Sequence, residues 1–167
     1  GKGKKPIVRT GSIGGGSTTK GQIGSAIITI EEGDIQAQYV MAASPDNTFT
    51  MNGGTIRHSY HTDPEYKHIQ KDGGAVYIMQ GTFLMTDGEI RNCTGENGGA
   101  VYIAGVDSEN TTFTMNGGSI LQSTADYNGG ALYIENGVVT LNGGIIQENL
   151  AKMGKGGAIC IQGGNFY

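Results

Sequence analysis

One six-residue motif occurs four times in the chain and constrains its fold more than any other feature. Each copy has two glycines, an alanine and three residues that are mostly aliphatic, as in residues 73–78 (GGAVYI). A motif that recurs at intervals of this kind is typical of a solenoid, in which every repeat adds one coil to a stack. The alanines Ala75, Ala100, Ala131 and Ala158 are spaced 25, 31 and 27 residues apart.

A second motif alternates with the first, so that one repeat contains both. It begins with Phe or Val and ends with Ile, and its copies are residues 49–56, 83–90, 113–120 and 139–146. The runs between turns are four to six residues long, and glycine pairs interrupt them at a cost of about 1 kcal/mol per glycine in a helix. We therefore predict an all-β fold, a right-handed parallel β-helix over residues 24–167 with about five coils of three short strands.

Alternation within the strands predicts which side chains face the interior. In the first motif the fourth and sixth positions are always aliphatic, so they are expected to form stacked interior columns. Ala75 and Tyr77 are then expected to face outward. We expect the glycine pairs to form the corners, where Asn52, Asn116 and Asn142 occupy one position, with Thr86 in their place in one copy, and bond along the axis through their side chains. The predicted inward residues are Val76, Val101, Leu132, Ile159; Ile78, Ile103, Ile134, Ile161; Phe49, Phe83, Phe113, Val139; Met51, Met85, Met115, Leu141; and Ile56, Ile90, Ile120, Ile146.

Composition excludes several classes of protein. The net charge is -4 and the pI is near 5.3, which argues against a nucleic-acid partner. No apolar stretch approaches the roughly 18 residues that a membrane span needs, so no membrane span is expected. The two cysteines, Cys93 and Cys160, fit no disulfide framework and no zinc pattern, and we expect free thiols.

The GGA[VLI] motif and the segments 49–52 and 113–116 (both FTMN) carry a family resemblance. They resemble the repeats of polymorphic outer-membrane proteins and autotransporter-like adhesins, within the pectate-lyase-like β-helix architecture. The resemblance implies an extracellular or cell-surface location and a structural or adhesive module of a microbial surface protein. It also leaves open the alternative of a polysaccharide-binding or polysaccharide-cleaving protein, because this architecture carries both activities.

The outward column Tyr77, Tyr102 and Tyr133 is the first candidate binding surface. Stacked aromatic rings offer a large rigid area and a hydroxyl, which suits glycans or a host surface protein. The alternative is that a loop or the N-terminal segment covers these rings.

Catalytic, cofactor and metal sites are not expected. The three histidines fall in the polar insertion of residues 57–72, without the spacing of a metal site. Asp87 and Glu89 are the close outward acidic pair, whereas polysaccharide-cleaving enzymes converge two acids or a calcium ion on the sugar. We therefore expect a chain that is not an enzyme.

Residues 1–23 form a basic, Gly- and Ser-rich segment that differs from the rest of the chain. One interpretation is a linker. The other is an arm whose residues add as a strand to the open edge of a neighbouring copy, which would link copies end to end into a fibre. The predicted arm residues are Pro6, Ile7, Val8, Arg9 and Thr10.

Overall fold

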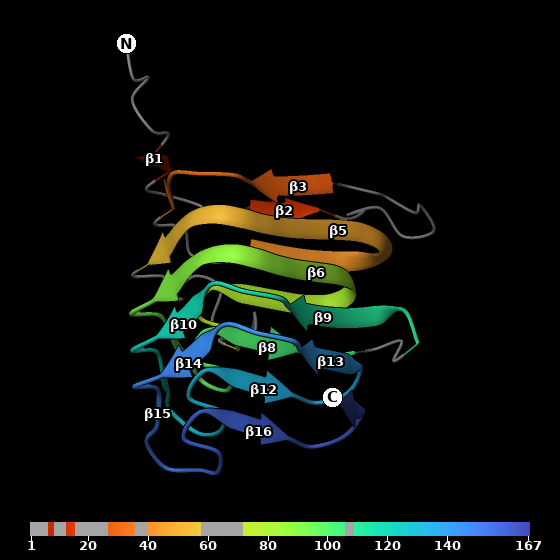
Figure 1. Ribbon diagram of the computed structural model, residues 1–167. Coiled ribbons are helices and arrows are strands. Elements are labelled where there is room, and N and C mark those ends of the chain that lie inside the picture. The colour runs from red at the N-terminus through yellow and green to blue at the C-terminus, as the bar shows by residue number, and fades with distance from the viewer. Residues whose placement is uncertain (1–6, 9–12, 16–26, 36–39, 58–71, 106–108) are drawn as a thin grey trace, which may run out of the picture.

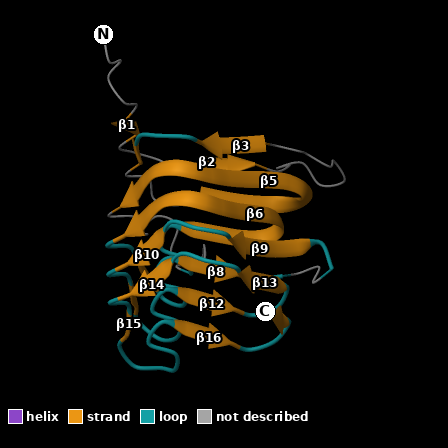
Figure 2. Ribbon diagram, viewed as in Figure 1, coloured by secondary structure: helices purple, strands orange, loops and turns teal. Residues whose placement is uncertain are grey.

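The structure, a computed structural model, describes residues 7–8, 13–15, 27–35, 40–57, 72–105 and 109–167. Within these residues every regular element is a β-strand, and no helix is present (Figure 2). There is accordingly no helix in the described residues that is long and apolar enough to cross a membrane. The strands are β1 (Ile7–Val8), β2 (Ile13–Gly15), β3 (Ile27–Ile30), β4 (Asp34–Ile35), β5 (Val40–Arg57), β6 (Val76–Arg91), β7 (Thr94–Gly95), β8 (Val101–Ile103), β9 (Thr111–Met115), β10 (Ser119–Leu121), β11 (Thr124–Ala125), β12 (Leu132–Ile134), β13 (Val138–Leu141), β14 (Ile145–Gln147), β15 (Leu150–Ala151), β16 (Ile159–Ile161) and β17 (Asn165–Phe166).

The described strands stack along one axis in parallel pairs, with shifts of register only between β5 and β6 (Figure 1). The first motif forms one column of strands that runs from the start of β6 through β8 and β12 to β16. The second motif supplies the neighbouring columns, from β6 to β9, β13 and β17 and from β6 to β10 and β14. The predicted fold class is confirmed: the chain is an all-β parallel β-solenoid.

The number of coils is about three rather than the predicted five. Each complete coil also has a fourth short strand, because β7, β11 and β15 form a separate three-stranded sheet. The coils that contain β3 and β5 have no described strand in this sheet, and the last coil ends with β17. These coils are therefore incomplete in the described structure.

Strand pairing begins before residue 24, where the solenoid was expected to start. β2 pairs with the first residues of β5, and β1 pairs with β4. Parts of the segment 1–23 therefore pair with the first coils of the same chain.

The interior is a single hydrophobic cluster made by the predicted inward columns. The rings of Phe49, Phe83 and Phe113 stack along the axis, with centroids 4.6 and 4.8 Å apart. Aliphatic residues and methionines of the other columns are buried beside them from coil to coil. The inward assignment is thus confirmed for these columns, apart from the last coil, where Ile161 is exposed.

The prediction that Ala75 faces outward is wrong. Ala75, Ala100 and Ala131 are fully buried in the main core, because the strand proper begins only at the next residue. The backbone N–H groups of Ala75 and Val76 both donate to the carbonyl of Ala100, so the chain is still turning at the alanine. The residue at this position is small because it lies on the inside of a corner.

The glycine pairs form corners, as predicted. Gly98 has φ +63°, in the left-handed region that favours glycine. The adjacent Gly99 lies directly against the next coil, where an added Cβ would overlap the carbonyl oxygen of Gly130. The two glycines of a pair therefore have different roles, one in the turn and one in the close approach of coils.

A second kind of corner contains no glycine and was not predicted. It joins the third strand of a coil to the short fourth strand, and its central residue has a left-handed backbone in three successive coils. A left-handed conformation is uncommon outside glycine, although asparagine adopts it more readily than most residues. The residues are Asn92 (φ 53°), Gln122 (φ 51°) and Glu148 (φ 56°).

Side-chain amides also stack along the axis. The Nδ2 of Asn142 donates to the Oδ1 of Asn116 at 2.8 Å, and the hydroxyl of Thr86 donates to the Oδ1 of Asn52 at 2.7 Å. The predicted amide column is confirmed by these two pairs. The Nδ2 of Asn52 in turn donates to a carboxylate oxygen of Glu31 at 3.0 Å.

A longer polar ladder, which we call the Asp72 ladder, precedes the glycine pairs and was not predicted. Asn97 donates its backbone N–H (2.9 Å) and its Nδ2 (3.0 Å) to the Oδ1 of Asp72. Asn128 repeats both bonds to the Oδ1 of Asn97 at 3.2 and 2.9 Å. The backbone N–H of Lys155 then donates to the Oδ1 of Asn128 at 2.9 Å. The ladder thus links four successive copies of one corner.

Candidate functional site

The predicted tyrosine column exists as a stack of parallel rings. The centroids of Tyr77 and Tyr102 lie 5.2 Å apart with an interplanar angle of 7°, and those of Tyr102 and Tyr133 lie 5.2 Å apart with an angle of 20°. These rings form a cluster separate from the main core, together with Ala104 and Met79. The column therefore lies on the outer side of the first column of strands, as the alternation predicts.

The column is nevertheless not an open aromatic platform. Tyr77 and Tyr102 are each only 5% exposed, and Tyr133 alone is partly accessible. A flat sugar ring needs access to the ring faces, which the stacking and burial of Tyr77 and Tyr102 remove. Their role in the described structure is that of a second, smaller hydrophobic core.

A partly buried hydrogen bond accompanies this second core. The hydroxyl of Tyr102 donates to Oε2 of Glu135 on the next coil at 2.5 Å. Burial raises the pKa of Tyr102 well above its ordinary value, and the hydrogen bond to Glu135 raises it further. Burial also raises the pKa of Tyr133. Tyr102 is thus held as a neutral donor that links two coils.

Asp72 is the first described member of the Asp72 ladder. Burial raises the pKa of this carboxyl, while the hydrogen bonds from Asn97 act in the opposite direction. The nearby charges of Glu96 and Glu135 raise it as well. Since its oxygen accepts two bonds from Asn97, its place in the structure is that of a hydrogen-bond acceptor.

The acidic pair Asp87 and Glu89 is engaged in local contacts. Glu89 forms an ion pair with Nε of Arg91 at 2.7 Å, and Asp87 accepts the backbone N–H of Gly88 at 2.8 Å. The three histidines, His58, His61 and His68, lie outside the described residues. Among the residues that the structure describes, no group of three or more His, Cys, Asp or Glu side chains is placed to hold a metal ion.

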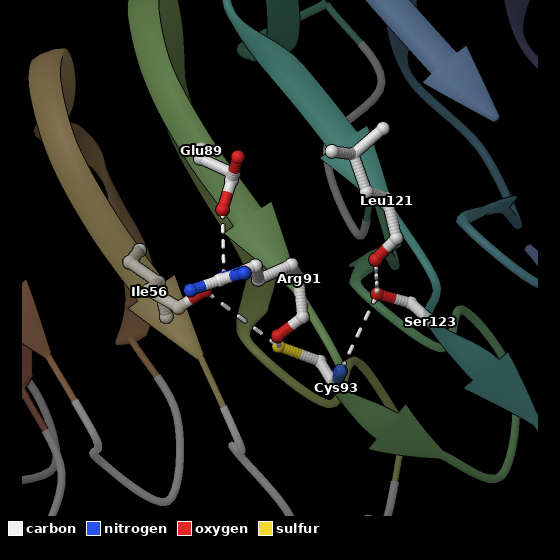
Figure 3. Close-up of polar contacts among 6 residues, drawn as sticks. All are labelled: Ile56, Glu89, Arg91, Cys93, Leu121 and Ser123. Atoms are coloured by element: carbon white, nitrogen blue, oxygen red, sulfur yellow. Dashed lines mark hydrogen bonds and ion pairs between the residues drawn. The ribbon is translucent and has the colours of Figure 1, made fainter. Parts of the chain in front are cut away.

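Cys93 is buried in the main core, in the corner between β6 and β7 (Figure 3). Its Sγ is 3.2 Å from the carbonyl oxygen of Arg91, and its backbone N–H donates to Oγ of Ser123 at 3.4 Å. Ser123 donates in turn to the carbonyl of Leu121 at 3.1 Å (Figure 3). Both Cys93, which is buried, and Cys160, which is partly exposed, are free thiols, in agreement with the prediction.

The predicted assembly arm is only partly described. Ile7 and Val8 form β1 and pair with Asp34 and Ile35 of the same chain, so these two residues lie on the chain's own first coils. Pro6, Arg9 and Thr10 lie outside the described residues. An arm that reaches a neighbouring copy would have to release this pairing.

The last coil exposes residues whose equivalents in earlier coils are buried. Ile161 is 46% exposed, whereas Ile78, Ile103 and Ile134 of the same column are fully buried. Phe166, which follows Phe113 and Val139 in its column, is 41% exposed. The lower face of this coil, at the bottom of Figure 1, is therefore an apolar surface on which no coil of the described residues is stacked.

The outward positions of the penultimate coil are also more apolar than their equivalents. Ile145 follows Glu89 and Ser119 in one column and is exposed. Leu150 follows Thr94 and Thr124 in another and is exposed as well. Aligning the coils residue by residue would have shown this change from polar to apolar. The apolar surface thus continues from the lower face onto the side of the solenoid.

The chain matches no family model, no curated protein and no solved structure. The repeat and the stacked coils establish a β-solenoid.

Proposed function

We propose that the chain is an extracellular structural or adhesive β-solenoid module of a microbial surface protein. Its coils form a rigid spacer, and the apolar face of its last coil serves for the stacking of a further coil, which a second copy of this chain can supply. The observation that carries the proposal is the continuous stack of parallel coils, whose interior columns are buried from coil to coil. The resemblance of the repeats to those of outer-membrane and autotransporter-like adhesins supports the surface location.

Rigidity follows from contacts that repeat in every coil. Backbone pairing, the phenylalanine stack and the Asp72 ladder each link successive coils at a different position around the axis. Because each coil buries its apolar residues only against its neighbours, the stack resists bending and local opening. A module of this kind suits a stalk that holds other parts of a protein at a fixed distance.

Association through the last coil follows from the same physics. Burial of apolar area stabilises by about 25 cal/mol per Å², and Ile161 and Phe166 regain this burial only when another surface covers them. The free edge of the last strands also offers unpaired backbone groups, which are a template for pairing with another chain. A second copy supplies both an apolar surface and a strand edge of matching dimensions.

The alternative is a polysaccharide-binding or polysaccharide-cleaving protein. The feature that most favoured it, an accessible aromatic column, is not found in the described part of the chain. The aromatic column that would carry sugar rings is buried at Tyr77 and Tyr102. The acidic pair that would carry chemistry contacts Arg91 and Gly88 instead. We therefore place the structural module first.

Sedimentation velocity at rising concentration, with negative-stain microscopy of the same samples, tests the association. We expect the mass of the unmodified chain to rise with concentration. A double variant, Ile161→Lys with Phe166→Lys, is expected to remain monomeric because it places two charges on the apolar face. An unmodified chain that stays monomeric throughout would rule out association through the last coil.

Tyr127→Lys is the matched control. Tyr127 is 47% exposed, which is similar to Ile161 and Phe166, but it lies at a corner of an earlier coil. It should associate like the unmodified chain, and equal loss of association in the control would assign the effect to net charge. Antibody labelling of intact producing cells tests the location separately, and labelling only after permeabilisation would contradict a surface location.

A further inference from the structure

Six Asn-Gly dipeptides occur in the chain; five lie at a corner or strand end of the solenoid, and Asn52-Gly53 lies at a shift of register within β5. Asn-Gly is the dipeptide most prone to spontaneous deamidation, because glycine has no side chain to hinder attack by its own backbone nitrogen. The reaction requires that this nitrogen and the asparagine side chain are free to approach each other. The six asparagines are Asn52, Asn97, Asn116, Asn128, Asn136 and Asn142.

Three of the six, Asn97, Asn128 and Asn142, are restrained at both reacting groups. The side-chain amides of Asn97 and Asn128 donate along the Asp72 ladder, at 3.0 and 2.9 Å. The nitrogens that would attack are also bonded, since Gly98 donates to the carbonyl of Asn128 and Gly129 to that of Lys155, both at 2.9 Å. Reaction at either site must first break both bonds.

At Asn142 the side chain is bonded and Gly143 also donates its N–H to the carbonyl of Met115 at 3.3 Å, whereas Asn52 and Asn116 are restrained by their side chains. Asn52 and Asn142 each donate a side-chain hydrogen bond, to Glu31 at 3.0 Å and to Asn116 at 2.8 Å. Asn116 accepts that second bond through its Oδ1, which fixes its amide plane. The deamidation rates of these three asparagines are therefore expected to lie between those of Asn97 and Asn128 and that of an asparagine without such bonds.

Asn136 differs from the other five. It lies with Glu135 and Gly137 in the three-residue connection between β12 and β13, and it is partly exposed. Within the described part of the chain, neither its side chain nor the N–H of Gly137 has a hydrogen-bond partner. Gly137 has φ +108°, a conformation that other residues rarely adopt, so the fold itself requires glycine after Asn136.

We propose that Asn136-Gly137 is a self-modification site, at which the folded chain deamidates faster than at its other Asn-Gly pairs. The deprotonated nitrogen of Gly137 attacks Cγ of Asn136, the new N–Cγ bond forms, and the bond from Cγ to Nδ2 breaks with release of ammonia. Water then opens the resulting succinimide at either carbonyl. The products are aspartate and isoaspartate, the latter with one additional methylene in the main chain.

The modification changes a structurally sensitive corner. It adds a negative charge beside Glu135, whose carboxylate already accepts the hydroxyl of Tyr102. The longer backbone of isoaspartate also displaces Gly137, whose carbonyl accepts the N–H of Asn165 in the last coil. Deamidation at Asn136 is therefore expected to loosen the last coil before the earlier ones.

The test is peptide mapping by mass spectrometry after incubation of the folded chain at mildly alkaline pH. Each deamidation adds close to one mass unit, so the six sites are followed in one sample. We expect Asn136 to react roughly tenfold or more faster than Asn97 and Asn128, because breaking their hydrogen bonds slows those reactions. Equal rates at Asn136 and Asn97 in the folded chain would overturn the proposal.

Two controls distinguish protection by the fold from an effect of local sequence. In denaturant the six deamidation rates should become similar. If Asn136 still reacts faster than the others there, its fast rate is caused by the neighbouring residues in the sequence and not by the fold. Asp72→Ala removes the acceptor of the Asn97 amide and should raise the rate at Asn97 while that at Asn136 is unchanged. If the variant is still folded and the deamidation rate at Asn97 is unchanged, the Asp72 ladder does not protect Asn97 from deamidation. That result would also overturn the proposal.

Discussion

The phenylalanine stack makes a sharp prediction about where the solenoid is most sensitive. Phe83 is fully buried between Phe49 and Phe113, with ring centroids at 4.6 and 4.8 Å. Phe83→Ala therefore removes two ring contacts and leaves a cavity in the middle of the core. Phe166 belongs to the same column of inward positions but is 41% exposed, so Phe166→Ala is the matched comparison.

The expected magnitudes differ clearly. Truncating a buried phenylalanine costs about 3–5 kcal/mol, and each stacked pair contributes about 0.5–1.5 kcal/mol beyond its buried area. Because Phe83 loses two such pairs, we expect a loss of about 4–5 kcal/mol in the free energy of unfolding. Phe166→Ala removes a half-buried ring and should cost about 1–2 kcal/mol.

Urea denaturation followed by circular dichroism measures both changes, and thermal unfolding gives an independent check. For a chain of this size the Phe83→Ala loss corresponds to a fall of ~10 °C or more in Tm. If the two variants lose the same stability, the stacked interior column is not the main source of cohesion between coils. The reasoning from burial would then be refuted.

Two further predictions concern a corner and a buried phenol. Gly99→Val should destabilise strongly, since its side chain would overlap the carbonyl of Gly130, and unchanged thermal unfolding would contradict the corner assignment. The raised pKa of Tyr102 means that the folded chain keeps this phenol neutral, so its contribution to stability is intact below about pH 10 and is lost as the pH rises above that value. Tyr102→Phe should therefore weaken the alkaline loss of stability, and identical pH profiles of unfolding for the variant and the unmodified chain would argue against a buried Tyr102.

The interior of the solenoid could be predicted because its signal repeats. The position of Ile78 is aliphatic in every copy. Because side chains alternate between the two sides of a strand, the aliphatic positions assign one side of the strand to the core. The fourth strand could not be predicted in the same way, since Thr94–Gly95 is too short to show alternation. The left-handed corner was missed because Asn92, Gln122 and Glu148 share a backbone conformation but no residue type.

The candidate surfaces were harder to predict than the core. Alternation places Tyr77 and Tyr102 on the outer side of a strand, but it says nothing about what packs against that side. Ala75 was assigned to the wrong side because alternation was extended into a corner, where it does not hold. The apolar residues of the last coils are recognised only when each coil is compared with the others. A search for the pattern that all coils share hides such differences.

The Asp72 ladder has a consequence for how such a chain gains or loses length. Asn97 and Asn128 each donate to the coil before them and accept from the coil after them, so each is complementary to a copy of itself. A duplicated coil inserted between them would find both of its partners already in place. A carboxylate such as that of Asp72 accepts without donating, so a coil placed before it would receive no bond from it. Gene duplication can therefore lengthen this solenoid from within, one coil at a time, without any change in the neighbouring coils.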